Sequence, residues 1–311
     1  GAHLAAVQRL FHHRLVDSGD GAVCDALFEE EEGVIMKTAA RRAVLSVCVF
    51  CVACFSGASS LFAAAWVQPY GETFFSFSLS EYESGWYRDE EGARRKSGDG
   101  AYRKREWKLY IEHGLTEETT LLFSLPWQRA EKLAPSNFSE SGFHDLEIGI
   151  RRRLWARGFE TASWQALVGI PAGYDTEKSF RLGEGNTYLD LRYLWGRSYE
   201  MSGRYGYISL EGGIRHFLEG VEVDQFRMDG TWFHPFSKKW GLQSTFSVIE
   251  GFSISSAPGR NGFSLWKAGA GVVYSPTDQT DIMVRNIWDF AGKNTGDGSN
   301  LELVFSTRIG R

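Results

Sequence analysis

Apolar and polar residues alternate in short segments along the chain from residue 70 onward. In TFFSFSLS (residues 73–80), Phe and Leu alternate with Ser, and in REWKLYIEH (residues 105–113), apolar residues alternate with Glu and Lys. This alternation predicts β-strands, because successive side chains of a strand point to opposite faces. Such segments occur at residues 73–80, 105–113, 120–128, 144–155, 164–170, 188–195, 208–215, 226–232, 242–248, 266–272, 282–285 and 301–308. The pattern predicts an all-β fold of about twelve strands, of which residues 282–285 are the weakest.

The connections between these strands differ systematically in length. LTEET, ARGFE, PFSKK and SPTDQ are short turns, whereas GWYRDEEGARRKSGDGA and RAEKLAPSNFSESG are long and polar. A soluble β-sandwich also alternates apolar and polar residues, so the connections decide between the two folds. Short turns at one end and long loops at the other are typical of transmembrane β-barrels. We therefore expect an antiparallel up-and-down barrel with both termini at the periplasmic end. The connection SYEMSGR is longer than a minimal turn, and AGKNTGDG is expected to be an outer loop.

Aromatic residues occur near the ends of the predicted strands. Their amphipathic rings favour the headgroup level of a membrane, which predicts two aromatic girdles, although ordinary core packing is the alternative interpretation. The candidates are Trp127, Trp155, Trp164, Trp195, Trp232, Trp240, Trp266, Tyr274 and Trp288. Pro126 and Pro171 are expected at outer strand ends, where a lost ladder hydrogen bond does least harm.

Residues 36–65 have the composition of a secretory signal peptide. MKTAARR carries three basic residues, AVLSVCVFCVACF (residues 43–55) is apolar, and Ala63–Ala65 offers a small-residue cleavage site. This order predicts export and cleavage after Ala65. The apolar run is shorter than the roughly twenty residues of a spanning helix, so a retained anchor is the less favoured alternative. Residues 1–35 are expected to be an upstream extension, which arises when the reading frame is assigned to begin before the true start at Met36. With residues 36–65 removed as the signal peptide, residues 66–311 are expected to form the mature barrel.

The remaining composition excludes several classes of function. All four cysteines precede the expected cleavage site, so the mature chain has no disulfide or thiol chemistry. Cys54 is weakly similar to a lipoprotein acylation site. The net charge is −5 without a basic block, so nucleic acid is not an expected partner. The histidines after residue 66 are far apart, so neither a metal nor a cofactor is expected. The cysteines are Cys24, Cys48, Cys51 and Cys54.

Charged side chains occupy the alternate face of the predicted strands. A lipid-facing Arg or Lys costs roughly 2–4 kcal/mol at the membrane midplane, so these side chains are expected to line the lumen. The predicted lumen-lining residues are Glu106, Lys108, Glu112, Asp145, Glu147, Arg151, Arg153, Asp190, Arg192, Glu211, Arg215, Arg227, Asp229, Lys267, Arg285, Glu302 and Arg308. Both signs occur in similar numbers, which predicts an ion-pair network without a strong ion preference. Most of these charges are expected to brace the wall and a minority to select a solute. About twelve strands predict a narrow, partly plugged pore.

Several segments together resemble a family of Gram-negative outer-membrane barrels, the MetA-pathway phenol-degradation proteins, which are more distantly similar to porin-like transporters. The resemblance lies in WVQPYGE (66–72), YIEHGLTEETTLLFSLPWQ (110–128), GFHDLEIGIRRRLW (142–155), VGIPAGY (168–174) and AGKNTGDGSNLELVF (291–305). It implies an outer-membrane channel or transporter for small, often hydrophobic molecules. Two departures are His144, where the motif more often has Gly, and the ending FSTRIGR in place of a terminal aromatic residue.

We therefore expect a porin-like outer-membrane transport barrel that passes small solutes, including hydrophobic or aromatic ones. Its expected partners are outer-membrane lipid, the solute and the barrel-assembly machinery during insertion. The alternatives are an outer-membrane enzyme acting on lipids, a non-conducting structural barrel, and a soluble periplasmic β protein. Outer-membrane barrels that hydrolyse lipids are characterised by a His-x-Ser motif, in which the histidine activates the serine hydroxyl. None of the histidines after residue 66 has a serine two residues later; they are His113, His144, His216 and His234. The chain is therefore not expected to be an enzyme.

Overall fold

The described part of the chain covers residues 65–98, 100–133, 137–176, 182–218, 223–252 and 262–310 of a computed structural model. These residues all belong to the second of two compact units, which spans residues 57–311. The expected upstream extension, the expected signal peptide up to residue 64 and all four cysteines lie outside the described residues. In the described part, no helix is both long and apolar enough to cross a membrane.

The described elements are β-strands. They are β1 (Thr73–Arg88), β2 (Arg94–Lys96), β3 (Tyr102–Thr116), β4 (Thr119–Lys132), β5 (Phe138–Phe143), β6 (Leu146–Arg157), β7 (Glu160–Ile170), β8 (Tyr188–Met201), β9 (Arg204–Phe217), β10 (Asp224–Pro235), β11 (Trp240–Phe252), β12 (Ser264–Tyr274), β13 (Thr280–Lys293) and β14 (Thr295–Ile309). Eleven of the twelve predicted segments fall within one long strand, and the segment 144–155 begins two residues before β6, so Asp145 precedes the strand on which it was expected. The short strands β2 and β5 were not predicted.

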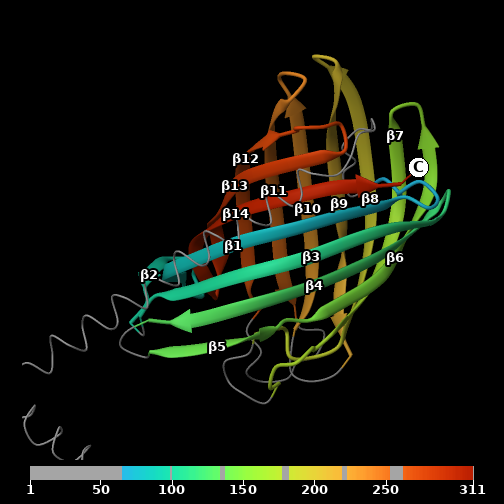
Figure 1. The fold of residues 1–311 in the computed structure, drawn as a ribbon. Coiled ribbons are helices and arrows are strands. Elements are labelled where there is room, and N and C mark those ends of the chain that lie inside the picture. The colour runs from blue at the N-terminus through green and yellow to red at the C-terminus, as the bar shows by residue number, and fades with distance from the viewer. Residues whose placement is uncertain are drawn as a thin grey trace, which may run out of the picture. The chain divides into compact units, whose positions relative to one another are not determined.

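The strands form one antiparallel sheet that closes on itself (Figure 1). Neighbours in sequence are neighbours in the sheet, and β1 pairs with β14 from Thr73 opposite Ile309 to Arg88 opposite Thr295. The short strands β2 and β5 are additions to the edges of β1 and β4. Twelve long strands therefore make a closed up-and-down barrel, which confirms the predicted fold class and leaves neither β1 nor β14 as an open edge.

Burial alternates along the strands as the sequence pattern predicts. In β4, Thr120, Leu122 and Ser124 are buried, whereas Leu121 between them is exposed. Leu191 in β8 and Leu301 in β14 are half exposed, at 50% and 58%. Apolar side chains thus cover the outside of the barrel, and the buried residues face its interior.

The two ends of the barrel differ in their connections. Both ends of the described chain lie at one end, with two-residue turns at 117–118, 158–159 and 202–203; we call this the turn end. The strand ends that the longer connections join, from β1 to β3, β4 to β6, β7 to β8 and β11 to β12, lie at the other end, which we call the loop end. The predicted asymmetry is therefore present for these four connections, whereas Asn294 alone joins β13 to β14 at the loop end.

Two connections are shorter than the sequence pattern indicated. The segment SYEMSGR contains only a two-residue turn, Ser202-Gly203, in which both residues have positive φ (54° and 71°). Such a turn matches the twist of a hairpin. The expected outer loop AGKNTGDG belongs almost entirely to β13 and β14, which are joined by Asn294 alone with φ 49°. Polar residues therefore extend these two strands where a loop was expected.

The proline prediction is half right. Pro171 directly follows β7, as expected, but Pro126 lies in the middle of β4. Residues 119–124 of β4 pair with β6, and residues 127–132 pair with β5. Pro126 lies where the partner on this side changes from β6 to β5, so its missing N–H interrupts no ladder there, while the pairing with β3 continues through Lys108 opposite Pro126.

Candidate functional site

The interior wall of the barrel carries buried charge of both signs. Among the predicted lumen residues, Glu112, Asp145, Arg151, Asp190, Arg215, Glu302 and Arg308 are buried. Charges are buried in proteins when they are paired or hydrogen-bonded. The partners of these groups therefore show how the interior is organised.

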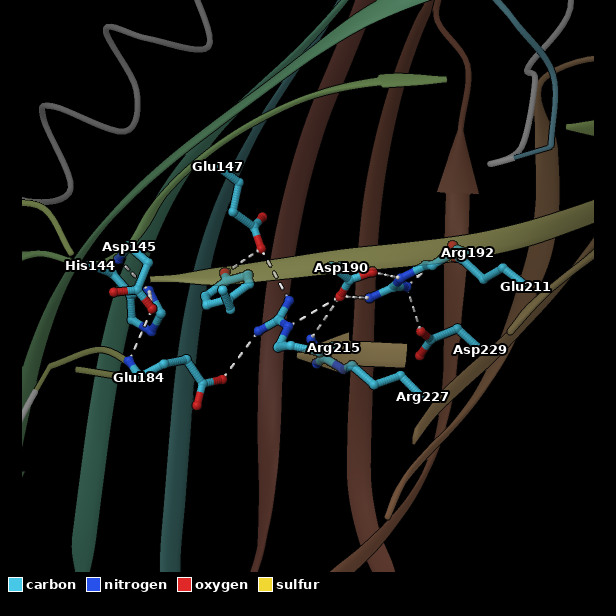
Figure 2. Close-up of polar contacts among 11 residues, drawn as sticks. His144, Asp145, Glu147, Glu184, Asp190, Arg192, Glu211, Arg215, Arg227 and Asp229 are labelled. Atoms are coloured by element: carbon cyan, nitrogen blue, oxygen red, sulfur yellow. Dashed lines mark hydrogen bonds and ion pairs between the residues drawn. The ribbon is translucent and has the colours of Figure 1, made fainter. Parts of the chain in front are cut away.

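Asp190 is the centre of an ion-pair cluster near the loop end (Figure 2). Arg192 reaches it through Nε and Nη2 at 2.6 and 3.1 Å, which is a bidentate pair. Nε of Arg215 donates to the same carboxylate at 3.1 Å, and Nη1 of Arg227 lies 3.9 Å away. One carboxylate thus holds three guanidinium groups, which come from three adjacent strands.

Further carboxylates surround these arginines. Nη1 of Arg192 contacts Glu211 at 3.2 Å and Asp229 at 3.0 Å. Nη1 and Nη2 of Arg215 contact Glu184 and Glu147, both at 3.2 Å. Asp190, these four carboxylates and the three arginines form what we call the Asp190 cluster. Acidic groups outnumber basic ones within it.

One member of the cluster, Glu184, belongs to the loop between β7 and β8. Asp145, which follows β5, accepts a hydrogen bond from the hydroxyl of Tyr174 and another from the backbone N–H of Glu184 at 2.9 Å. The carbonyl oxygen of Leu182, which is buried, accepts from Gln128. Residues 182–187 of the loop between β7 and β8 therefore pack against interior side chains and narrow the barrel at its loop end.

A second set of contacts involves the residues before β1. Trp66 packs edge-on against Tyr207 of β9, with ring centroids 6.1 Å apart. The backbone N–H of Gln68 donates to Thr120 of β4 at 2.7 Å, and its side-chain amide donates to Glu112 of β3 at 2.6 Å. Residues 65–72, which we call the N-terminal segment, thus contact strands from β3 to β9 inside the turn end.

Arg151 anchors this segment to the wall. Its Nη1 contacts Glu112 at 3.0 Å and donates to the carbonyl oxygen of Trp66 at 3.0 Å. Ser163 donates to the carbonyl oxygen of Ala65 at 2.7 Å. A side chain at Gly114 would overlap the carbonyl oxygen of Pro69, so glycine is required for this close approach.

The remaining predicted residues lie apart from both sets. Arg285 pairs with Glu302 at 2.6 Å, Lys267 lies 4.0 Å from Asp289, and Glu106 pairs with Lys104 at 3.3 Å. Arg308 is buried on the inner face of β14. Neither Lys108 nor Arg153 has an ion-pair partner within 4.0 Å among the residues that the structure describes. The predicted network is therefore several separate groups, and the use of its members in transport stays a prediction.

Sequence reasoning missed four partners. Lys104 and Asp289 continue the same alternation, but Lys104 lies one residue before the predicted strand 105–113, and Asp289 lies four residues after the predicted strand 282–285. Glu184 lies in a loop without periodic pattern, so no local signal marked it. No sequence pattern indicated that Trp66 lies inside the barrel, although its segment WVQPYGE contributed to the family resemblance.

The described histidines lie at separate places. His113 contacts the hydroxyl of Thr73 at 2.9 Å, and His234 lies 3.3 Å from that of Tyr199. His144 and His216 each contact an aspartate. These contacts do not join histidine, serine and carboxylate into a triad within the described residues.

Comparison with known proteins supports the fold. No family model matches the chain, and no curated protein matches it. The chain is similar in structure to a COG4313 outer membrane channel from Pseudomonas putida F1, with TM-score 0.67, 14% identity, and 81% of this chain and 100% of that chain covered. It is also similar to the NanC porin, with TM-score 0.50, 8% identity, and coverage of 76% and 100%. The chain therefore has the porin-like fold of an outer-membrane channel barrel.

Proposed function

We propose that this porin-like barrel is an outer-membrane channel for small solutes, and that the N-terminal segment and the Asp190 cluster control passage. The observation that carries the proposal is a closed wall with apolar side chains outside and paired charges inside. That distribution suits a barrel with lipid around it and water within it. Export to the outer membrane by the predicted signal peptide and insertion by the assembly machinery are parts of the same proposal.

The solute class follows from the two constrictions. The Asp190 cluster fills part of the interior at the loop end, and the N-terminal segment fills part of it at the turn end, so we expect only small solutes to pass. Tyr207 and Phe233 are buried beneath Trp66, so the partly exposed ring of Trp66 is the aromatic surface proposed to face the solute. Small hydrophobic or aromatic molecules are therefore the proposed solutes, in agreement with the resemblance to the MetA-pathway phenol-degradation barrels.

Conduction tests the proposal directly. The purified mature chain, reconstituted in planar bilayers, is expected to show openings of small conductance. Liposomes that contain it should swell faster in a small aromatic solute than in a disaccharide. Silence in bilayers together with absence of swelling would refute the channel.

A disulfide tests the role of the N-terminal segment. Residues 66–311 contain no cysteine, so Gln68→Cys with Thr120→Cys introduces the only thiol pair. The backbone N–H of Gln68 lies 2.7 Å from the Thr120 hydroxyl, so the pair is within reach of a bridge. The oxidised variant is expected to open more rarely than the wild type, and reductant should restore the openings. The single variant Gln68→Cys, which cannot form the bridge, is the control.

A further inference from the structure

The outer face of β1, β3, β4 and β5 changes abruptly from apolar to charged near the loop end. The register places Leu79, Trp107, Trp127 and Phe143 side by side in one outward row. The rings of Trp107 and Trp127 are 5.4 Å apart, and Trp107 is 55% exposed. Large exposed aromatic residues are typical of the membrane interface. This row therefore marks the level of the lipid headgroups.

The next outward row, about 6.5 Å further along the strands, is polar. It contains Glu81, Arg105, Arg129 and Ser141, which lie opposite one another in the register. Arg105 and Arg129 are roughly half exposed. Two guanidinium groups directly opposite each other on one face repel, which destabilises a sheet unless an anion lies with them.

The neighbouring carboxylates balance the charge of this face, because Arg103 pairs with Glu81 at 3.5 Å and with Glu83 at 3.2 Å. They use only part of the hydrogen-bonding capacity of Arg105 and Arg129. Nε of Arg105 contacts Glu81 at 3.3 Å, and Nε of Arg129 contacts Glu131 at 2.6 Å. Each contact uses one of the five N–H donors of a guanidinium group. Guanidinium groups match phosphate oxygens in bidentate geometry.

We propose that Arg105 and Arg129 together bind the phosphate of an outer-leaflet lipid, the phosphorylated glycolipid of the Gram-negative outer membrane. Its acyl chains lie along the apolar outward rows that begin with Trp107 and Phe143. The required ligand is an amphiphile with an anionic head, because the charged row adjoins an apolar wall. The inference rests on the outer-membrane location in the proposed function and is independent of conduction.

Lipid binding to the detergent-purified barrel tests this site. Native mass spectrometry would compare bis-phosphorylated lipid A with chemically dephosphorylated lipid A. The wild type is expected to retain the phosphorylated form preferentially. Arg105→Gln with Arg129→Gln should weaken that binding by at least about tenfold, because each basic residue at a lipid surface contributes to anion attraction. Equal binding of both lipids by the wild type, or unchanged binding by the variant, would overturn the proposal.

Two further variants make the result specific. Arg152→Gln with Arg157→Gln removes two exposed arginines at the turn end and should leave lipid A binding unchanged. An equal loss in this control would show a general charge effect and refute the site. Glu81→Gln removes the carboxylate that competes for Arg105 and should strengthen binding severalfold, whereas weaker binding would count against the proposal. This variant keeps the inference testable if the double arginine variant does not fold.

The outcome is separable from that of the proposed function. The arginine variant should conduct like the wild type, because its side chains lie on the outer face. A wild type that is silent in bilayers and shows no liposome swelling, but selects phosphorylated lipid A, would refute the channel and keep this site.

Discussion

Arg151 and Trp66 are joined by a hydrogen bond of 3.0 Å from Nη1 of the arginine to the carbonyl oxygen of the tryptophan. The same Nη1 pairs with Glu112, so a buried ion pair of the wall also binds the chain before the first strand. Arg151 therefore links the wall of the barrel to the N-terminal segment, in addition to the contacts of Gln68 and Ser163.

Removal of the Trp66 ring should loosen the N-terminal segment. The ring packs against Tyr207 and lies against Gly196, where a side chain would overlap it. Trp66→Ala is expected to weaken the attachment by about 2 kcal/mol and to raise the mean conductance. Tyr70→Ala is the matched control, because Tyr70 is in the same segment and is 69% exposed. Single-channel recordings check this, and identical conductance of Trp66→Ala and wild type would contradict it.

The Asp190 cluster should be a large stabilising unit of the loop end. Asp190→Asn leaves three guanidinium groups without their shared carboxylate, so the free energy of unfolding should fall by about 3 kcal/mol. Urea titration followed by heat-modifiable migration in detergent measures this quantity. In the control Glu160→Gln, the lost partner Arg197 is 62% exposed and 3.5 Å away, so a loss of about 0.5 kcal/mol or less is expected. Equal losses would show that the cluster is no stronger than a surface pair.

The hydrogen bond from the Tyr174 hydroxyl to Asp145 should weaken when the pH is high enough to deprotonate the tyrosine. Burial raises the pKa of the Tyr174 phenol above its usual value, and the hydrogen bond to Asp145 raises it further. A raised pKa means that the folded state holds the proton more tightly, so the contact stabilises fully below the ordinary tyrosine pKa of about 10 and weakens above it. Tyr174→Phe should therefore leave the tyrosinate absorbance between pH 9 and 10 unchanged. A loss of amplitude in that range would contradict the shift.

The lipid-facing wall should reject charge most strongly in its middle. Leu210 lies in the middle of β9 and is 45% exposed, so Leu210→Arg should cost roughly 2–4 kcal/mol of folding free energy in liposomes. Leu154→Arg introduces the same change near the turn end of β6, at a residue that is 53% exposed, and should cost about 1 kcal/mol or less. Equal costs would indicate that the outer wall does not face hydrocarbon.

The sequence by itself determined the strands and the faces of the barrel. Period-two alternation is a local property, because a side chain such as Leu191 or Asp190 is assigned to a face by its neighbours in the chain. For the same reason, Lys104 and Asp289 could have been found by extending two strands. The lengths of the β8–β9 and β13–β14 connections were misjudged because positive φ at Ser202 and Asn294 permits tighter turns than composition indicates.

Only the tertiary structure decided how the interior is filled. Glu184 joins the Asp190 cluster and Trp66 reaches Tyr207 through contacts between residues far apart in the chain, and no periodic pattern marks such contacts. The partition of the charges into separate groups depends on the register across strands, which places Arg192, Arg215 and Arg227 around one carboxylate. Alternation specifies which side chains point inward, but closure of the cylinder specifies which of them meet.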